Sequence, residues 1–346
     1  MTKLLLSFFL IFTLAAPVSA LEITAPEVPQ SGAELMPEDT DSFGDGLMEL
    51  VQSAILHIRP DLAEASKVSL SVITAVMIVS LLRTFTGSVK SAVDMAGATA
   101  IAAVLLLSAN SMIQLGAETV RELSEYGKLL YPVMTAAMAA QGGVTASSAL
   151  YMGTAIFDMI LSSLISKCLV PMVYLFLALA AANSAAGEDV LKKMCDLIKN
   201  LMSWCLKTIL VVFTTYMSIT GVVSGTTDAA ALKATKVTIS SVVPVVGGIL
   251  SDASEAVLVS AGLMKNAAGI YGIFAILAVF LEPFLRIGVH YLLLKATTAI
   301  CGIFGSKGMT GLIDDFSTAM GLLLAMTGSV CLLLLISTVC FMKGVG

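Results

Sequence analysis

The chain has 346 residues, of which 58% are hydrophobic and only 12% are charged, and its formal net charge is −5. Soluble domains carry roughly 25% charged residues, so this composition, with a mean hydropathy of +0.96, excludes an ordinary soluble domain. We expect an all-α polytopic membrane protein surrounded by membrane lipid. The small negative charge gives no reason to expect nucleic-acid binding.

Residues 1–20 have the pattern of a cleavable signal peptide. Lys3 precedes an apolar core from Leu4 to Ala16, and Val18-Ser19-Ala20 supplies a small-residue cleavage site. The apolar core is shorter than the ~20 residues that a membrane span needs, although an uncleaved anchor is the alternative. After cleavage the mature protein would begin near Leu21, on the extracytoplasmic side of the membrane.

The next part of the chain, residues 21–66, reads as an acidic extracytoplasmic segment. Leu21 to Asp45 is rich in Pro, Glu and Asp and lacks apolar periodicity, which predicts a flexible stretch. From Phe43 to Ser66 apolar residues recur at helical spacing, which predicts an amphipathic helix along the outer membrane surface. Pro60 is expected to end or bend this helix.

The remainder, residues 67–346, is the predicted membrane domain, with about eight transmembrane helices. The apolar segments are 68–86, 95–115, 146–167, 169–186, 203–223, 255–281, 284–301 and 317–342. With the N-terminus outside, eight spans leave Lys192, Lys193 and Lys199 on the outer side, which conflicts with the excess of basic residues expected in cytoplasmic loops. One more or one fewer span between 131 and 200 would remove this conflict.

Two short apolar runs are interrupted by Pro and Gly and predict re-entrant half-helices. A helix broken within a membrane leaves backbone N–H and C=O groups that lipid cannot satisfy, so such a segment must be covered by protein or line a polar cavity. The residues that would shape these runs are Pro132, Gly142 and Gly143 in the first and Pro244, Gly247, Gly248 and Asp252 in the second.

The two broken runs also raise the question of an internal repeat. Pro132 and Pro171 are separated by the same number of residues as Pro244 and Pro283. An internal duplication relating 132–223 to 244–342 would explain this spacing. Coincidental placement of Pro and Gly explains it as well, so both interpretations stay open.

A few ionisable residues lie within apolar segments. Asp158 is in the middle of one, and intramembrane acids usually face a cavity or a partner; alternatively, its segment is placed so that Asp158 reaches the lipid headgroups. Glu282, Arg286 and His290 recur at i, i+4 and i+8 on one helix face. This stripe predicts a buried Glu282–Arg286 ion pair, with a proton path as the alternative.

The chain shows no enzyme signature. It has no H-E-x-x-H, no P-loop, no G-x-S-x-G, only two histidines, and six cysteines without C-x-x-C spacing. We therefore expect no catalytic residue, no cofactor and no metal site.

Three runs resemble the stage III sporulation protein AE family of endospore-forming bacteria. They are YPVMTAAMAAQGG at 131–143, TTDAAALKATK leading into VVPVVGGILSDA at 226–253, and VSAGLMKNAAGIYG at 259–272. The last run adds Lys265 and Asn266 to the candidate residues. The resemblance covers residues 45–342.

The resemblance implies a membrane subunit of a multiprotein, secretion-like channel that joins the mother cell to the engulfed forespore and sustains late forespore gene expression. It also implies insertion in the mother-cell membrane that surrounds the forespore. Its partners would be other stage III sporulation channel proteins of the same operon, including a cytoplasmic ATPase. The broken helices alone would also suit a different class, an autonomous secondary transporter with inverted repeats.

Overall fold

The fold is that of a computed structural model, which describes residues 25–37, 43–86, 90–242 and 247–343, and of 221–265 only the course of the backbone. These residues form α2 (Gln30–Ala33), α3 (Phe43–His57), α4 (Arg59–Phe85), α5 (Lys90–Ala140), α6 (Val144–Leu164), the π-helical turn η1 (Ile165–Leu169), α7 (Val170–Ala186), α8 (Asp189–Val242), α9 (Gly247–Cys301) and α10 (Lys307–Lys343). The described ranges contain no strand, so the all-α prediction is confirmed.

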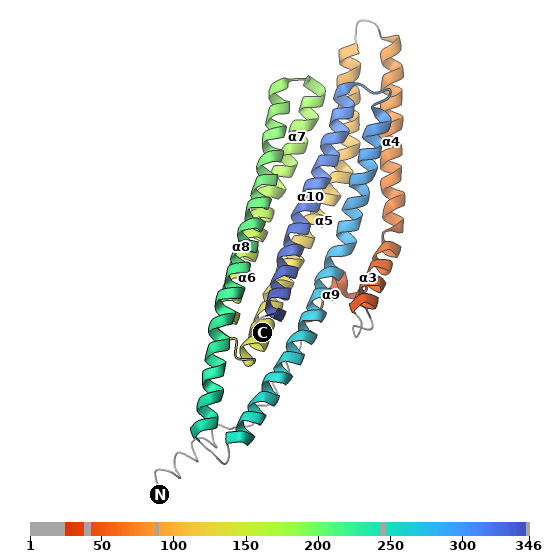
Figure 1. The fold of residues 1–346 in the computed structure, drawn as a ribbon. Coiled ribbons are helices and arrows are strands. Elements are labelled where there is room, and N and C mark those ends of the chain that lie inside the picture. Colours follow the sequence, from red (N-terminus) through yellow and green to blue (C-terminus); the bar gives the residue numbers. More distant parts are fainter. Residues whose placement is uncertain (1–24, 38–42, 87–89, 243–246, 344–346) are drawn as a thin grey trace.

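The long helices run up and down one bundle (Figure 1). In the view of Figure 1, α4 rises, α5 descends, α6 continues through η1 into α7 as one rising helix, α8 descends, α9 rises and α10 descends. α10 is the most enclosed of these helices, since 61% of its most apolar stretch is buried, against 17% for α4. The bundle is therefore built around α10.

The prediction of eight spans is not confirmed. Six helices in the described part of the chain are long and apolar enough to cross a membrane. The segments predicted at 146–167 and 169–186 are joined in one helical stretch, Val144–Ala186, and those at 255–281 and 284–301 both lie in α9, which contains Pro283. Proline removes only one helical hydrogen bond, and packing against neighbouring helices lets the chain continue through it.

The first predicted half-helix is also absent. Pro132 lies inside α5 rather than at the start of a new helix. The helix ends instead at the glycine pair, where Gly142 has a φ of 91° and the N–H of Gly143 donates to the carbonyl of Met138 at 3.2 Å. A positive φ is strained for residues with a Cβ but not for glycine. The glycine pair therefore permits the tight reversal between α5 and α6.

The second broken run lies largely outside the described residues. α8 ends at Val242 and α9 begins at Gly247, so the backbone of Gly247 and Gly248 opens α9, whereas Pro244 falls in the undescribed gap. The side chains of Asp252 and Lys265 are likewise outside the description, and Asn266 is exposed on α9. The re-entrant character of this run stays a prediction.

The acidic segment is more ordered than its composition suggests. α2 packs so closely on α9 that a Cβ on Gly32 would lie 2.8 Å from the backbone nitrogen of Val279. Leu35, only 2% exposed, joins a small apolar cluster with Leu50 of α3 and Phe274 of α9. The expectation of a flexible stretch is therefore wrong for this part of it, because its few apolar residues find a tertiary partner that local periodicity does not reveal.

The two candidate repeats run in the same direction through the bundle. α6–α7 rises and α8 descends, and α9 rises and α10 descends in the same sense (Figure 1). An inverted repeat requires opposite directions, so this order of helices does not favour the inverted-repeat transporter.

Several basic residues lie beside the connections at one end of the bundle. The connections α4–α5, α7–α8 and α9–α10 all lie at the end shown uppermost in Figure 1. We call this end of the bundle the basic end. The basic residues beside its connections are Arg83, Lys90, Lys192, Lys193 and Lys307. Six passes thus bring Lys192 and Lys193 to the same side as Arg83, which removes the conflict that eight spans created.

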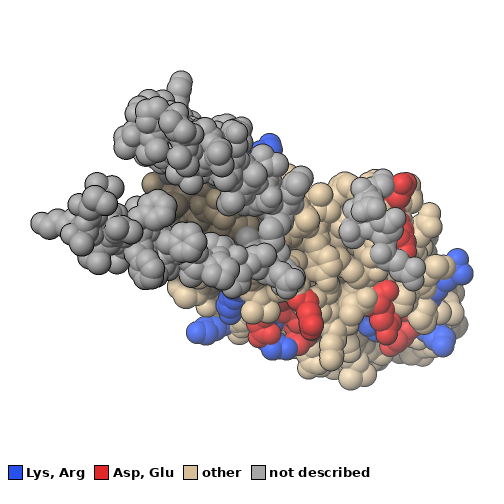
Figure 2. Space-filling view, turned by 90° about the horizontal axis from the view of Figure 1, so that it is seen from below, with Lys and Arg blue, Asp and Glu red and all other residues tan. Residues whose placement is uncertain are grey.

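Much of the outer surface is apolar. α4 exposes Leu70, Leu81 and Phe85, and α8 exposes Leu197 and the single tryptophan, Trp204. Seen along the bundle from below, the described residues show charged side chains in only a few groups on an otherwise uncharged surface (Figure 2). Such a surface is costly in water and suited to lipid, as expected for a multi-pass membrane protein.

Close helix packing depends on small residues, as at Gly153 where α6 meets α8. A Cβ built on Gly153 would lie 2.0 Å from the ring of Tyr216, whose hydroxyl donates to the carbonyl of Ala149 at 3.0 Å. Glycine at such contacts lets two helix backbones approach.

We predict that Gly153→Ala destabilises the protein by about 1–3 kcal/mol, because the Tyr216 ring must move and lose its hydrogen bond. Gly288→Ala in α9 is the matched control. Nothing lies within 4 Å of its added Cβ, and alanine is the better helix former by about 0.5–1 kcal/mol. Thermal unfolding in detergent would measure both, and a Gly153→Ala midpoint at or above that of the wild type would contradict the close contact.

Candidate functional site

The polar residues predicted within apolar segments fall into two separate places. Asp158 of α6 faces α5, and Arg286 and His290 of α9 face α4 and the bundle interior. The described residues of the two places share no hydrogen bond or ion pair. Each place is therefore described by itself.

Asp158 is a buried carboxylate with one hydrogen-bond partner. Its side chain is 2% exposed, and Oδ2 accepts a hydrogen bond of 2.7 Å from the hydroxyl of Ser124 on α5. Its Oδ1 has no partner among the described residues. The carboxylate thus faces the neighbouring helix α5, and it keeps one acceptor without a described partner in an interior where unsatisfied polar atoms are costly.

A polar hollow of about 180 Å³ opens beside Ser124, between α5 and the α6–η1 segment. We call it the serine niche; it is lined by Arg121, Ser124, Glu125 and Lys128 of α5, by Ser162 and Ser163 of α6, and by Ser166 and Lys167 of η1. π-helical turns often occur at functional sites. Here the turn supplies two of the eight lining residues.

The charges of the serine niche are unevenly paired. Arg121 bridges two carboxylates of its own helix, Glu118 and Glu125, the latter at 3.0 Å from Nη1. Lys128 and Lys167 make no ion pair or hydrogen bond within the described part of the chain. The niche therefore offers two ammonium groups without a direct carboxylate partner.

The predicted pair of Glu282 and Arg286 is not formed. Nη2 of Arg286 lies 2.7 Å from Oδ1 of Asp61 at the start of α4, and Glu282 has no ion pair with a described residue. The spacing along α9 permits the local contact, but the packing of α4 on α9 offers Arg286 a carboxylate that is only 13% exposed. A helix-face pattern cannot reveal a partner from another helix.

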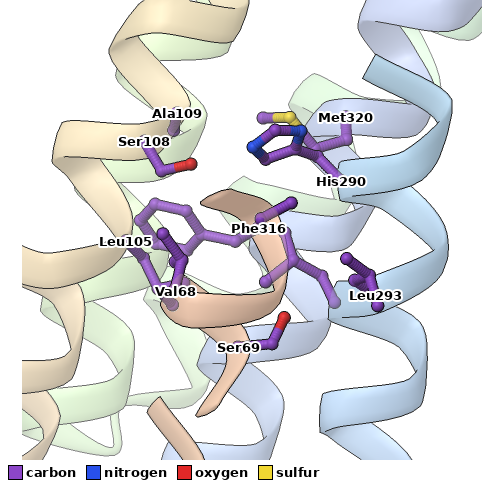
Figure 3. Close-up of a pocket in the computed structure, with 11 residues that line it drawn as sticks. Val68, Ser69, Leu105, Ser108, Ala109, His290, Leu293, Phe316 and Met320 are labelled. Atoms are coloured by element: carbon purple, nitrogen blue, oxygen red, sulfur yellow. The ribbon is translucent and has the colours of Figure 1, made fainter. Parts of the chain in front are cut away.

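His290 is turned into the bundle and does not extend a polar stripe. Its Nδ1 lies 3.0 Å from the carbonyl of Arg286, and the ring is 8% exposed. Figure 3 shows it beside Met320 and Phe316, around a cavity of about 10 Å³, which is close to the smallest that holds one water. The surroundings are mostly apolar, so the continuous chain of polar groups that a proton path needs is not formed at His290.

Several residues of these two places were not singled out from the sequence. Asp61 and Ser124 give no local signal, because their partners lie on other helices. Lys128 gives none, because the niche that it lines forms only where α6 and η1 pack on α5. The run Ser162-Ser163-Leu164-Ile165-Ser166-Lys167 does carry one, since hydroxyls and a lysine crowd within an otherwise apolar segment. No group of three or more His, Cys, Asp or Glu suited to a metal ion occurs among the residues whose side chains are described.

Comparisons with known proteins point to one family. A family model described as stage III sporulation protein AE matches residues 37–344. The stage III sporulation protein AE of Bacillus subtilis (strain 168) is 24% identical over 238 residues, which cover 68% of this chain and 59% of that protein. The aligned part thus spans less than two thirds of that relative's length. No solved structure matches the chain.

The ion pair between α4 and α9 leads to a testable prediction. Arg286→Ala and Asp61→Ala should each lower stability by about 1–3 kcal/mol, below the full cost for a buried pair because Arg286 is partly exposed. The double variant should recover much of this loss, since no charge is left unpaired. Glu282→Ala is the control on the same helix and should be close to neutral. Chemical unfolding in detergent measures the stability of all four variants. A loss of stability in Glu282→Ala as large as that in Asp61→Ala would indicate that Arg286 pairs with Glu282 after all.

Proposed function

Because the chain belongs to the stage III sporulation protein AE family, we propose that it is a membrane subunit of a multiprotein, secretion-like channel that links mother cell and forespore during endospore formation. In this role it supports late forespore gene expression and has no enzymatic activity of its own. The observation that carries the proposal is the extent of the family match, which includes all six candidate spans, from Arg59 to Lys343.

The distribution of charge supports an orientation in the membrane. Cytoplasmic loops carry an excess of Lys and Arg, so the basic end faces the cytoplasm of the mother cell. α4 begins and α10 ends well below these connections, on the side of the bundle away from the basic end (Figure 1). With six spans the mature N-terminal segment is then extracytoplasmic, as the signal-peptide pattern at 1–20 requires.

The partners proposed for this subunit are other channel proteins of the same operon, including a cytoplasmic ATPase. A cytoplasmic partner would meet the basic end. A hollow of about 310 Å³ there is lined by polar residues of α7, α8 and α10, among them Lys192, Lys199, Lys307, Asp196 and Asp314. Exposed charges of both signs suit a contact with a water-soluble protein.

An autonomous secondary transporter is the second candidate. It is favoured by Asp158, a buried acid that lies directly behind a hollow open to the surface, as in carriers that couple transport to protons. The parallel direction of the two helical hairpins argues against the inverted-repeat form of this candidate.

Deletion of the gene tests the leading proposal. In a sporulating host, we expect a late forespore reporter to fall sharply and an early forespore reporter to stay unchanged, with both normal after complementation. The purified chain, reconstituted alone in vesicles, should move no solute down an ion gradient. Transport by the isolated chain, together with a normal late reporter in the deletion strain, would establish the transporter instead.

The orientation is tested separately by labelling introduced cysteines in an otherwise cysteine-free chain. In cells that have not engulfed a forespore, so that the chain's membrane faces the medium, Lys193→Cys at the basic end should resist a membrane-impermeant maleimide applied from outside. Gln141→Cys, at the α5–α6 reversal, should react. Cells opened by detergent provide the reference in which both react. The opposite labelling pattern in intact cells would show that the protein has the reverse orientation in the membrane. It would not affect the family assignment.

A further inference from the structure

The chemistry of the serine niche is that of an anion site. Arg121 forms ion pairs with Glu118 and Glu125, so neither Arg121 nor Glu125 is free to bind a ligand strongly. The groups that remain are the ammonium groups of Lys128 and Lys167 and the hydroxyls of Ser163 and Ser166, none of which has a hydrogen-bond partner among the described residues. All four can donate hydrogen bonds, and the niche offers no free carboxylate to bind a cation.

We propose that the serine niche binds the phosphate group of an anionic ligand. Phosphate oxygens accept several hydrogen bonds at once, and bonds from ammonium groups to such oxygens are among the stronger ones in proteins. Asp158 does not oppose this binding directly, because it lies behind Ser124 and is not part of the lining. The Ser124 hydroxyl donates its hydrogen bond to Asp158. Hydrogen bonds to the ligand would therefore come from the other serines.

The position of the niche along the helices indicates where the phosphate comes from. α5 has 51 residues and the α6–α7 stretch has 43, which corresponds to roughly 76 and 65 Å, about twice the ~30 Å hydrocarbon core of a bilayer. Only part of each helix can therefore lie in the core. The charged middle of α5, from Glu118 to Lys128, and the Ser162–Lys167 run of the neighbouring helix are the places where both can leave it. That boundary is the level of phospholipid phosphates.

Apolar side chains are exposed on both helices between the niche and the basic end. Leu107 of α5 is 79% exposed and Leu175 of α7 is 51% exposed. A lipid whose phosphate sat in the niche could lay its acyl chains against this surface. An anionic phospholipid headgroup is therefore the favoured source, and a free phosphate or a soluble phosphate ester is the other.

Helical spacing explains why lysine and serine meet at this point. Ser162, Ser163, Ser166 and Lys167 stand at i, i+1, i+4 and i+5, so they share one face of the continuous helix that α6 and η1 form. That face lines the niche.

The test uses the purified full chain in detergent, with phosphatidylglycerol or phosphatidylcholine added and the thermal unfolding midpoint as readout. Phosphatidylglycerol should stabilise the wild type at lower concentration than phosphatidylcholine does. The variant Lys128→Gln/Lys167→Gln should need at least about tenfold more phosphatidylglycerol, because each lysine near an anionic headgroup contributes on the order of 1 kcal/mol. Ser163→Ala/Ser166→Ala, which keeps both charges, should also bind more weakly and serves if the lysine variant does not fold.

The matched control is Lys192→Gln/Lys193→Gln, which removes two exposed lysines from the basic end and should bind like the wild type. Equal loss in the two lysine variants, or equal stabilisation by both lipids in the wild type, overturns the proposal. A separate titration with inorganic phosphate distinguishes the sources. Protection of the wild type but not of Lys128→Gln/Lys167→Gln by inorganic phosphate alone supports the phosphate site and assigns it to a soluble ligand.

Discussion

The requirement that backbone hydrogen bonds be satisfied inside the protein governs this fold. Lipid offers no partner to a free N–H or C=O group, so an interrupted helix is far more costly here than in water. Pro132 and Pro283 accordingly lie within continuous helices, and a π-turn rather than a break joins α6 to α7. The chain reverses where glycine permits it, as at Gly142. The long helices that result are what allow distant polar residues to meet.

Packing around α10 takes the place of the hydrophobic driving force that holds soluble proteins together. In lipid, apolar side chains gain little from burial against one another, and close van der Waals contact between helices matters more. Small residues permit that contact, as Gly127 does against Leu334 of α10 and Gly153 does against Tyr216 of α8. The same closeness fixes the register of neighbouring helices and thereby decides which polar groups face each other.

Two buried or half-buried polar pairs join neighbouring helices. Ser124 of α5 bonds to Asp158 of α6, and Arg286 of α9 pairs with Asp61 of α4. Each pair holds two helices in one register and lowers the cost of burying its members. The serine niche differs, because Lys128 and Lys167 lie beside such a pair and have no carboxylate partner among the described residues. An anionic headgroup bound there would tie this part of the bundle to the lipid surface.

The sequence alone determined the class of the protein. Composition and the length of apolar segments can be read from the sequence directly, and an apolar segment that crosses lipid must satisfy its backbone hydrogen bonds within a helix. It also marked Gly142-Gly143 as a break in a helix and singled out the intramembrane acid Asp158. Tertiary structure decided what depends on neighbours: that prolines are absorbed into long helices, that six passes bring Lys192 and Lys193 to the same end as Arg83, and that Arg286 pairs with Asp61. A pattern along one helix specifies which residues share a face, but the partner across that face is set by how the helices pack.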